Sequence, residues 1–162
     1  MMEAGLVLTP FLAIFFALMD FTMAIFIKNT MQYAVRQGVR YAVTSQVQSG
    51  YGQDASIKNV ISSNAMGYLN LAAPTGTGRP CSGTGCITIQ YYKLVTSSLG
   101  VTTLNAVSGT GSNAGGNVVE VTAANLTWAW MVPLLRSATP LSFYVSSADV
   151  MEGTPFTGIP AR

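Results

Sequence analysis

The sequence contains no histidine among its 162 residues, and only 9% of its residues are charged. An ordinary soluble domain has about a quarter of its residues charged. Without histidine, Ser-His-Asp and Cys-His nucleophiles and all histidine-containing zinc sites are excluded. The formal net charge of +2 provides no concentrated basic surface for a phosphate backbone. We therefore expect neither an enzyme nor a nucleic-acid-binding protein, and no cofactor or metal.

Cysteine is also scarce, because Cys81 and Cys86 are the only two and they enclose four residues. Two thiols without histidine cannot complete a tetrahedral zinc site, and a redox-active pair is more often spaced Cys-x-x-Cys. Two glycines between them make the segment flexible enough for disulfide geometry. We predict a disulfide that closes this small loop and contributes about 2 kcal/mol.

What the sequence has in excess is hydrophobic residues at its N-terminus. Residues 4–27 are apolar or uncharged except for Asp20. As a helix this segment spans about 36 Å, enough to cross a hydrocarbon core of about 30 Å. A secretory signal peptide would have a basic leading region and a shorter apolar run. We interpret the segment as a retained membrane span.

The orientation of this span poses a conflict. Lys28, Arg36 and Arg40 all follow the span, so the positive-inside rule alone would place the C-terminal part in the cytoplasm. That part, however, carries both cysteines and is rich in Gly, Ser, Thr and Asn, as exported domains are. A short basic leader that preceded Met1 and was removed would resolve the conflict.

Asp20 is unusual because ionisable groups inside a membrane span are costly and usually have a partner. Lys28 or Arg36 of an adjacent subunit could be that partner. The alternative is that Asp20 lies at the membrane boundary with its carboxylate in water.

The helical pattern continues beyond the span to Val47 and stops at residues 49–52. The predicted helix has about 45 residues and a length of roughly 70 Å. Ala34, Gly38 and Ala42 recur at every fourth position and form a ridge of small residues that lets another helix approach closely. The remaining domain has a diameter nearer 30 Å, so half of the helix needs other partners. We divide the chain into residues 1–27, 28–48 and 49–162.

The last of these parts combines one short helix with several strands. Asp54 can cap a second helix with apolar residues at helical spacing. Four β-favouring runs then follow, separated by turn residues; they are residues 86–95, 101–107, 117–128 and 141–151. The predicted class is α+β, pilin-like, with one very long N-terminal helix packed on a small antiparallel sheet.

Particular segments also carry a family resemblance. They are Leu6–Pro10, Met19–Phe21, Gln32–Thr44, Val119–Thr122, Val132–Leu135 and Leu141–Met151. On these residues the chain resembles the TadE-like pilins of the tight-adherence (Flp-type) pilus, which are related to type IV pilins. The resemblance covers the first 45 residues well and the last 35 loosely.

The resemblance implies several steps of processing and assembly, with different partners. Such pilins are cut by a prepilin peptidase after a basic leader and held in the bacterial inner membrane. The pilus assembly machinery then extracts them into a helical filament of identical subunits, with or without other pilins, outside the cell. The implied function is that of a structural subunit for adhesion. The alternative is a single-span, membrane-anchored extracytoplasmic binding module that does not polymerise.

The same resemblance suggests roles for residues of the first half of the helix. In a filament core, the Glu3 carboxylate would neutralise an α-amino group, because an unpaired buried charge is costly. The alternative is that Glu3 is an ordinary polar flank of the span. Family members usually carry a glutamate six residues before the proline, whereas Glu3 lies seven before Pro10, so the cleavage point stays open. Gly5 and Pro10 would permit local bending during extraction.

Overall fold

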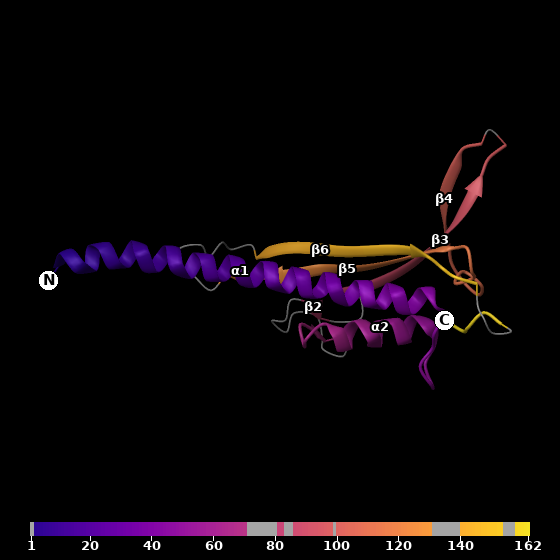
Figure 1. Cartoon of the computed structure of the whole chain (residues 1–162), viewed down its shortest axis with the longest axis horizontal. Helices are drawn as coiled ribbons and strands as arrows, with labels where there is room; N and C mark the ends of the chain where they lie inside the picture. Colours follow the sequence, from indigo (N-terminus) through magenta and orange to yellow (C-terminus); the bar gives the residue numbers. More distant parts are fainter. Residues whose placement is uncertain (1, 71–80, 83–85, 99, 131–139, 154–157) are drawn as a thin grey trace.

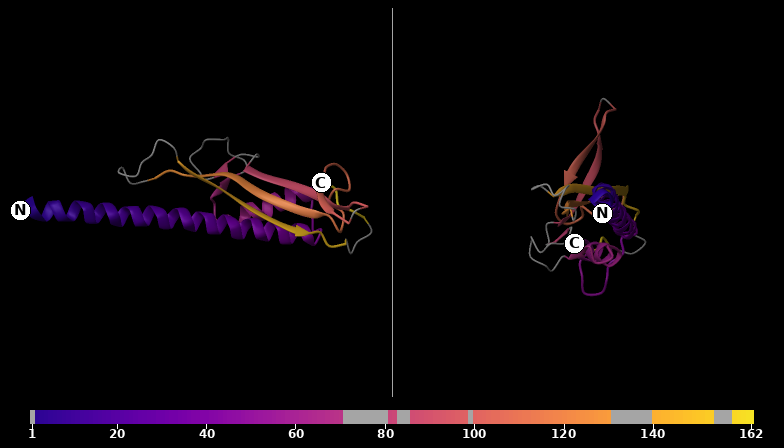
Figure 2. Two further views of the ribbon diagram at one scale, coloured as in Figure 1. Left: turned by 90° about the horizontal axis from the view of Figure 1, so that it is seen from above. Right: turned by 90° about the vertical axis from the view of Figure 1, so that its left-hand side faces the viewer.

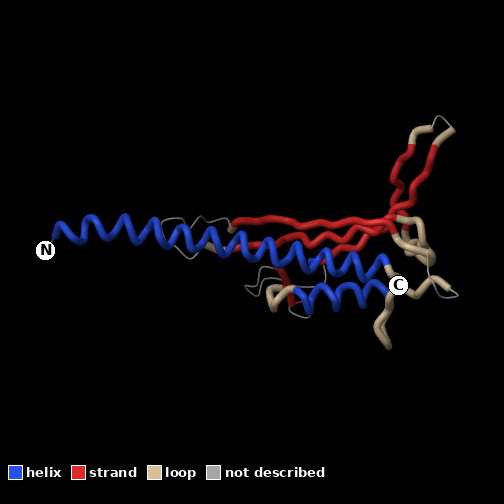
Figure 3. The backbone as a smooth tube through the Cα atoms, in the orientation of Figure 1, coloured by secondary structure: helices blue, strands red, loops and turns tan. Residues whose placement is uncertain are grey.

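The computed structural model of the chain describes residues 2–70, 81–82, 86–98, 100–130, 140–153 and 158–162. Side chains are described from residue 7 onward, except those of residues 70, 81 and 82. The molecule is elongated, and one long helix runs from its N-terminal end through the head (Figure 1). Figure 3 shows the two helices and the strands that lie alongside.

The long helix α1 comprises Met2–Val43, which is 42 residues. It passes through Pro10 without interruption, although proline cannot donate the backbone hydrogen bond to the carbonyl four residues earlier. By length and composition, α1 could cross a membrane, because within Val7–Val43 an 18-residue window has a mean hydropathy of 2.1. A signal sequence or the core helix of a soluble protein has the same length and composition, and burial along α1 distinguishes the core helix from a membrane span.

The helix α1 ends four residues before the predicted Val47. Ser45 adopts a left-handed conformation, with φ of 53°, and its backbone N–H donates to the carbonyl of Ala42 at 2.9 Å. A residue in this conformation just past the last turn is a common helix terminator. The terminal carbonyl of Val43 accepts a hydrogen bond from the backbone N–H of Glu152 at 3.1 Å, which ties the end of α1 to the segment after the last strand.

The second helix, α2 (Gln53–Asn64), packs against the C-terminal half of α1. The prediction that Asp54 caps it is wrong, because the N-cap residue is Gly52 and no side chain makes a capping hydrogen bond. Asp54 lies in the first turn instead, where a negative charge still favours the helix dipole. Its carboxylate contacts groups from distant parts of the chain, as described below.

Four strands form an antiparallel sheet in the order β4-β3-β5-β6. The strands are β3 (Ile87–Thr96), β4 (Thr102–Val107), β5 (Val118–Trp128) and β6 (Leu141–Val150). Strands β3 and β4 form a hairpin, but β3 also pairs with β5, so β4 lies at one edge and β6 at the other. This arrangement confirms the predicted α+β class, with its long N-terminal helix, short second helix and antiparallel sheet. A two-residue parallel pair, β1 (Leu69–Asn70) with β2 (Cys81–Ser82), was not predicted.

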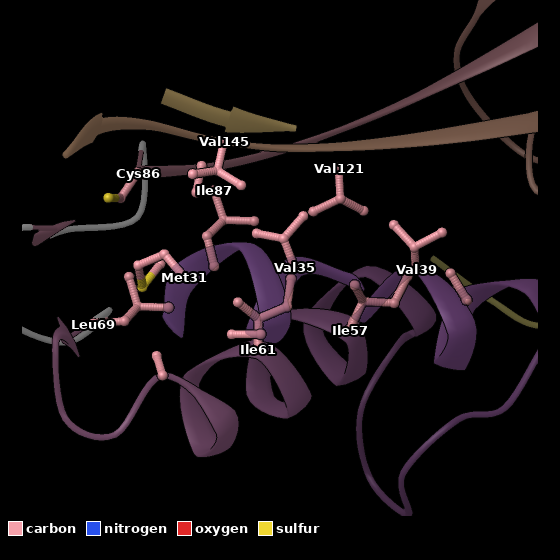
Figure 4. Close-up of a cluster of buried hydrophobic side chains, with 14 of the residues drawn as sticks. Met31, Val35, Val39, Ile57, Ile61, Leu69, Cys86, Ile87, Val121 and Val145 are labelled. Carbon is pink, nitrogen blue, oxygen red and sulfur yellow. The ribbon is translucent and has the colours of Figure 1, made fainter. Parts of the chain in front are cut away.

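The hydrophobic core is built around the C-terminal half of α1, which lies between α2 on one side and the sheet on the other (Figures 1 and 2). In Figure 4, Val35 and Val39 point from α1 between Ile57 of α2 and Val121 of β5. Buried positions on α1 recur at helical spacing; they include Ala24, Ile27, Met31, Ala34, Val35, Val39 and Ala42. Because both sides of α1 are covered here, this half of the helix forms the centre of the head.

Candidate assembly surface

The N-terminal half of α1 extends beyond the head with nearly all of its large apolar side chains exposed (Figure 1). These side chains are Val7, Leu8, Phe11, Leu12, Ile14, Phe15, Phe16, Leu18, Met19, Phe21, Ile25 and Phe26. Monomeric soluble proteins rarely expose contiguous apolar patches of more than a few hundred Å², and larger ones mark protein or membrane contacts. We name this set the α1 apolar surface. A soluble core helix would bury it, so it indicates a membrane or a protein partner.

Asp20 differs from its exposed neighbours because it is only 1% exposed. It lies on the helix face that continues, at spacings of four and three residues, to the buried Ala24 and Ile27. The side chain is therefore covered by the chain itself before any neighbour arrives. Lys28, which was considered as its partner in an adjacent subunit, is exposed, as are Arg36 and Arg40. These three basic side chains are therefore accessible on the part of α1 that follows the α1 apolar surface.

The ridge of small residues faces the chain's own second helix. Ala34, Gly38 and Ala42 are all buried. A Cβ atom added at Gly38 would lie 2.4 Å from Cγ1 and 2.7 Å from Cδ1 of Ile61 in α2. The absence of a side chain at Gly38 is thus what allows α2 to approach. The helix that the ridge accommodates here is α2 of the same chain.

The roles predicted for Glu3, Gly5 and Pro10 can be placed only in part. All three residues belong to α1, which is continuous through them. The side chain of Glu3 lies outside the described part of the chain, so its pairing stays a prediction. Bending at Gly5 and Pro10 concerns extraction from a bilayer and also stays a prediction.

The predicted disulfide involves one described side chain. Cys86 is buried immediately before β3, and its Sγ atom lies 3.3 Å from the carbonyl oxygen of Ala124. The side chain of Cys81 and the residues between the two cysteines lie outside the described part of the chain. The pairing of Cys81 with Cys86 therefore stays a prediction.

A polar cluster that the sequence did not reveal joins α2, the sheet and the C-terminal segment. We name Asp54, Tyr91, Ser112 and Arg162 the C-terminal clamp. The Tyr91 hydroxyl donates to Oδ1 of Asp54 at 2.8 Å, and Nε and Nη2 of Arg162 donate to Oδ2 at 3.0 and 2.9 Å. Nη1 of Arg162 donates to Ser112 Oγ at 2.8 Å, and the guanidinium carbon lies 4.7 Å from the centre of the Tyr91 ring.

The clamp perturbs the ionisation of its tyrosine. Burial raises the pKa of the Tyr91 hydroxyl above its ordinary value of 10.0, and the hydrogen bond to Asp54 raises it further. The positive charge of Arg162 acts in the opposite direction. Burial and the contact with Asp54 outweigh Arg162, so the Tyr91 hydroxyl stays neutral at physiological pH. Because the other members lie 37 to 108 residues from Asp54 in sequence, no local motif could have identified the clamp.

A second polar group lies beside the clamp. The side-chain amide of Gln53 donates to the Ala42 carbonyl at 3.2 Å, and its oxygen accepts a hydrogen bond from Asn113. Asn113 also donates to the Pro160 carbonyl at 2.9 Å. These bonds connect the ends of α1 and α2 to the C-terminal segment. The arrangement is typical of a structural hydrogen-bond network, and we assign it no catalytic or ligand-binding role.

Within the residues that the structure describes, no group of three or more His, Cys, Asp or Glu side chains could hold a metal ion. Trp128 is the last residue of β5, and Trp130 follows it closely. Trp128 is half-buried and packs against the core, whereas residues 131–139 lie outside the described part. The feature of the described residues that most clearly points to a partner is therefore the α1 apolar surface.

Comparison with known proteins points to the same part of the chain. The family model described as TadE-like protein matches residues 1–40, so the predicted family is confirmed for the N-terminal segment. The match points to a protein of the Tad pilus system, and the apolar helix fits a membrane or cell-surface location. No curated protein and no solved structure matches the chain.

Proposed function

Because the chain is TadE-like over residues 1–40, we propose that it is a structural pilin subunit. In this proposal it polymerises through α1 into an extracellular, tight-adherence pilus that serves adhesion. The α1 apolar surface is the observation that carries the proposal. It extends beyond the head along the N-terminal half of a single continuous helix, where the chain itself covers little of it.

The same surface serves two environments in turn. Before assembly, the largely exposed segment from Val7 to Phe26 spans the inner membrane, because its 20 residues have about the length that a bilayer core requires. After extraction, the phenylalanine and leucine side chains pack against α1 of neighbouring subunits. Burial of apolar surface away from water, at roughly 25 cal/mol per Å², stabilises the filament.

Charged residues then set the register between neighbouring helices. Glu3 and the exposed Lys28 are the groups that we assign to charge pairing between subunits, whereas Asp20 is already covered within its own chain. Processing by a prepilin peptidase and extraction by the pilus machinery precede this step. The function that we propose is assembly rather than catalysis.

Electron microscopy of intact cells, with antibodies raised against the head domain, tests the proposal. We expect labelled surface filaments from cells that express the unaltered chain. Recovery of the chain only as a membrane-embedded monomer would instead support the membrane-anchored binding module and refute polymerisation.

A matched pair of variants separates packing from membrane insertion. Replacing Phe11, Phe15 and Phe16 with alanine keeps the segment apolar enough to insert but removes three of the five exposed phenylalanine side chains of the α1 apolar surface. We expect this variant to remain in the membrane fraction and to form few or no filaments. The control is Met66→Ala, which alters an exposed apolar residue of the head and should leave filaments unchanged. Normal filaments from the triple variant would contradict the proposal.

A further inference from the structure

The outer part of the β3–β4 hairpin projects sideways from the head, away from the long axis of the molecule (Figures 1 and 2). We name this part, residues 92–96 and 102–106, the arm. From the pair Tyr91 and Val107 to the pair Thr96 and Thr102 the register advances five residues, or about 17 Å. This reach exceeds the 8–10 Å that separates the axes of packed helices, so the arm can touch a neighbouring subunit.

One face of the arm is apolar and uncovered. Leu94 and Leu104 are directly opposite each other across the hairpin and are 47% and 56% exposed. Tyr92 and Ala106 continue this face toward the sheet, since side chains alternate along each strand. A two-stranded hairpin without packing on either face is marginally stable in water. The arm therefore gains stability if a second surface covers the leucine pair.

The edge of the arm is also unprotected. Strand β4 consists of Thr102–Val107 and contains no charge and no proline, and its register with β3 is free of bulges. Natural edge strands usually carry such features, because they prevent pairing or packing with other chains. Lys93 is the only charged residue between positions 91 and 107, so the arm has no charge pattern that would select a strongly acidic or basic partner.

The opposite edge of the same sheet offers a matching surface. Tyr144, Ser146, Ala148 and Val150 alternate along β6, are all exposed and carry no charge. Two small side chains thus lie between the larger Tyr144 and Val150. We propose that the leucine face of the arm packs on this face of β6 in a second copy of the chain.

The size of the arm favours a second copy over an unrelated partner. Its ten strand residues fall short of the 20 to 30 residues per side that stable complexes use, so it would bind a free partner weakly. A second copy that α1 already holds nearby is present at a high effective concentration. In this respect the inference rests on the proposed function, although the contact itself is distinct from the α1 apolar surface.

Site-specific photo-crosslinking in cells that express the full chain tests the proposal. The photoreactive residue p-benzoylphenylalanine is placed at Leu94, at Leu104 and, as a control, at Thr103, which lies next to Leu104 but on the other face of the arm. We expect the two leucine positions to yield a species of twice the mass of the chain, with the link mapped by mass spectrometry to residues 141–150. The Thr103 position should yield little of it.

A second variant tests the receiving strand. Tyr144→Ala, combined with the photoreactive residue at Leu104, should lower the yield of the linked species by about fivefold or more, as loss of an aromatic side chain that anchors an interface does. The control is Tyr51→Ala, which alters an exposed tyrosine away from both surfaces. Links to a different protein, links outside residues 141–150, or no link from either leucine would overturn the proposal.

Failure of the arm contact and failure of the proposed function give different results in these experiments. Filaments that form without arm crosslinks would refute the arm contact and leave polymerisation standing. Arm crosslinks within membranes of cells that never form filaments would support the arm contact and refute polymerisation.

Discussion

Gly38 offers a direct test of how the centre of the head is packed. A Cβ atom at this position would lie 2.4 and 2.7 Å from side-chain carbons of Ile61 and 3.5 Å from Cγ2 of Ile57. Carbon atoms prefer separations of about 3.5–4.0 Å, and Ile61 is completely buried, so it has little room to move. Gly38→Ala should therefore introduce strain between α1 and α2.

The change in the free energy of unfolding that we expect for Gly38→Ala is the sum of two opposing effects. Alanine stabilises a helix interior by about 1 kcal/mol relative to glycine. Overpacking a core by one carbon atom costs about 1–3 kcal/mol. We expect Gly38→Ala to lower the free energy of unfolding by about 0–2 kcal/mol, in contrast to its usual stabilising effect.

A double-mutant cycle with Ile61→Ala tests whether the strain arises from contact with Ile61. Ile61→Ala alone should cost about 2–5 kcal/mol because it leaves a cavity. In that background the added Cβ atom meets no clash, so Gly38→Ala should become stabilising, and the coupling between the two sites should be about 1–3 kcal/mol. The measurement is equilibrium unfolding of the detergent-solubilised full chain, followed by circular dichroism.

Asn29→Ala provides the control, since Asn29 lies on the exposed face of α1 and its effect should be the same in both backgrounds. If Gly38→Ala stabilised the unaltered chain as much as the Ile61→Ala variant, the packing of the small-residue ridge against α2 would be refuted. The ridge would then be free for a helix of another subunit.

Three further predictions concern the head. Gly115→Ala should cost about 1–3 kcal/mol, because its Cβ atom would lie 2.7 Å from the backbone of Gly153, whereas Gly153→Ala, with open space around it, should change the melting temperature little. Asp54→Asn should cost about 1 kcal/mol by thermal melting, since the ion pair with Arg162 is partly exposed; an unchanged melting temperature would contradict a stabilising clamp. The raised pKa of Tyr91 means that above about pH 10 the unfolded chain releases this proton while the folded chain retains it. Stability should consequently fall as the pH rises above 10, and Tyr91→Phe should show a shallower fall in urea unfolding at pH 9, 10 and 11.

Local sequence patterns predicted the secondary structure well where a single physical preference dominates. The β-branched and aromatic runs predicted all four strands of the sheet to within one residue at each end. The end of α1 was missed because Ser45 takes a left-handed conformation, which serine does not usually favour. Tertiary contacts, such as the hydrogen bond from Glu152 to Val43, hold the chain in this turn, and no local pattern contains them.

Among the candidate functional features, one could likewise be predicted from local sequence and two depend on the fold. The α1 apolar surface could be predicted because composition and length alone define a membrane-grade helix. The partner of the Gly38 ridge could not be predicted, since small residues permit a close approach by any helix and only the fold places Ile61 there. The C-terminal clamp required Asp54, Tyr91 and Arg162 to meet, which depends on how α2, β3 and the C-terminal segment pack.

The continuity of α1 has a mechanical consequence. A single helix from Met2 to Val43 joins the apolar half to the centre of the head. Axial tension on the N-terminal half therefore reaches residues such as Met31 and Val35 directly, and it acts as shear along their contacts with α2 and the sheet (Figure 4). Such a load is shared by many side chains at once. The packing around the C-terminal half of α1 therefore resists the pulling of this helix out of the head along the whole packed length.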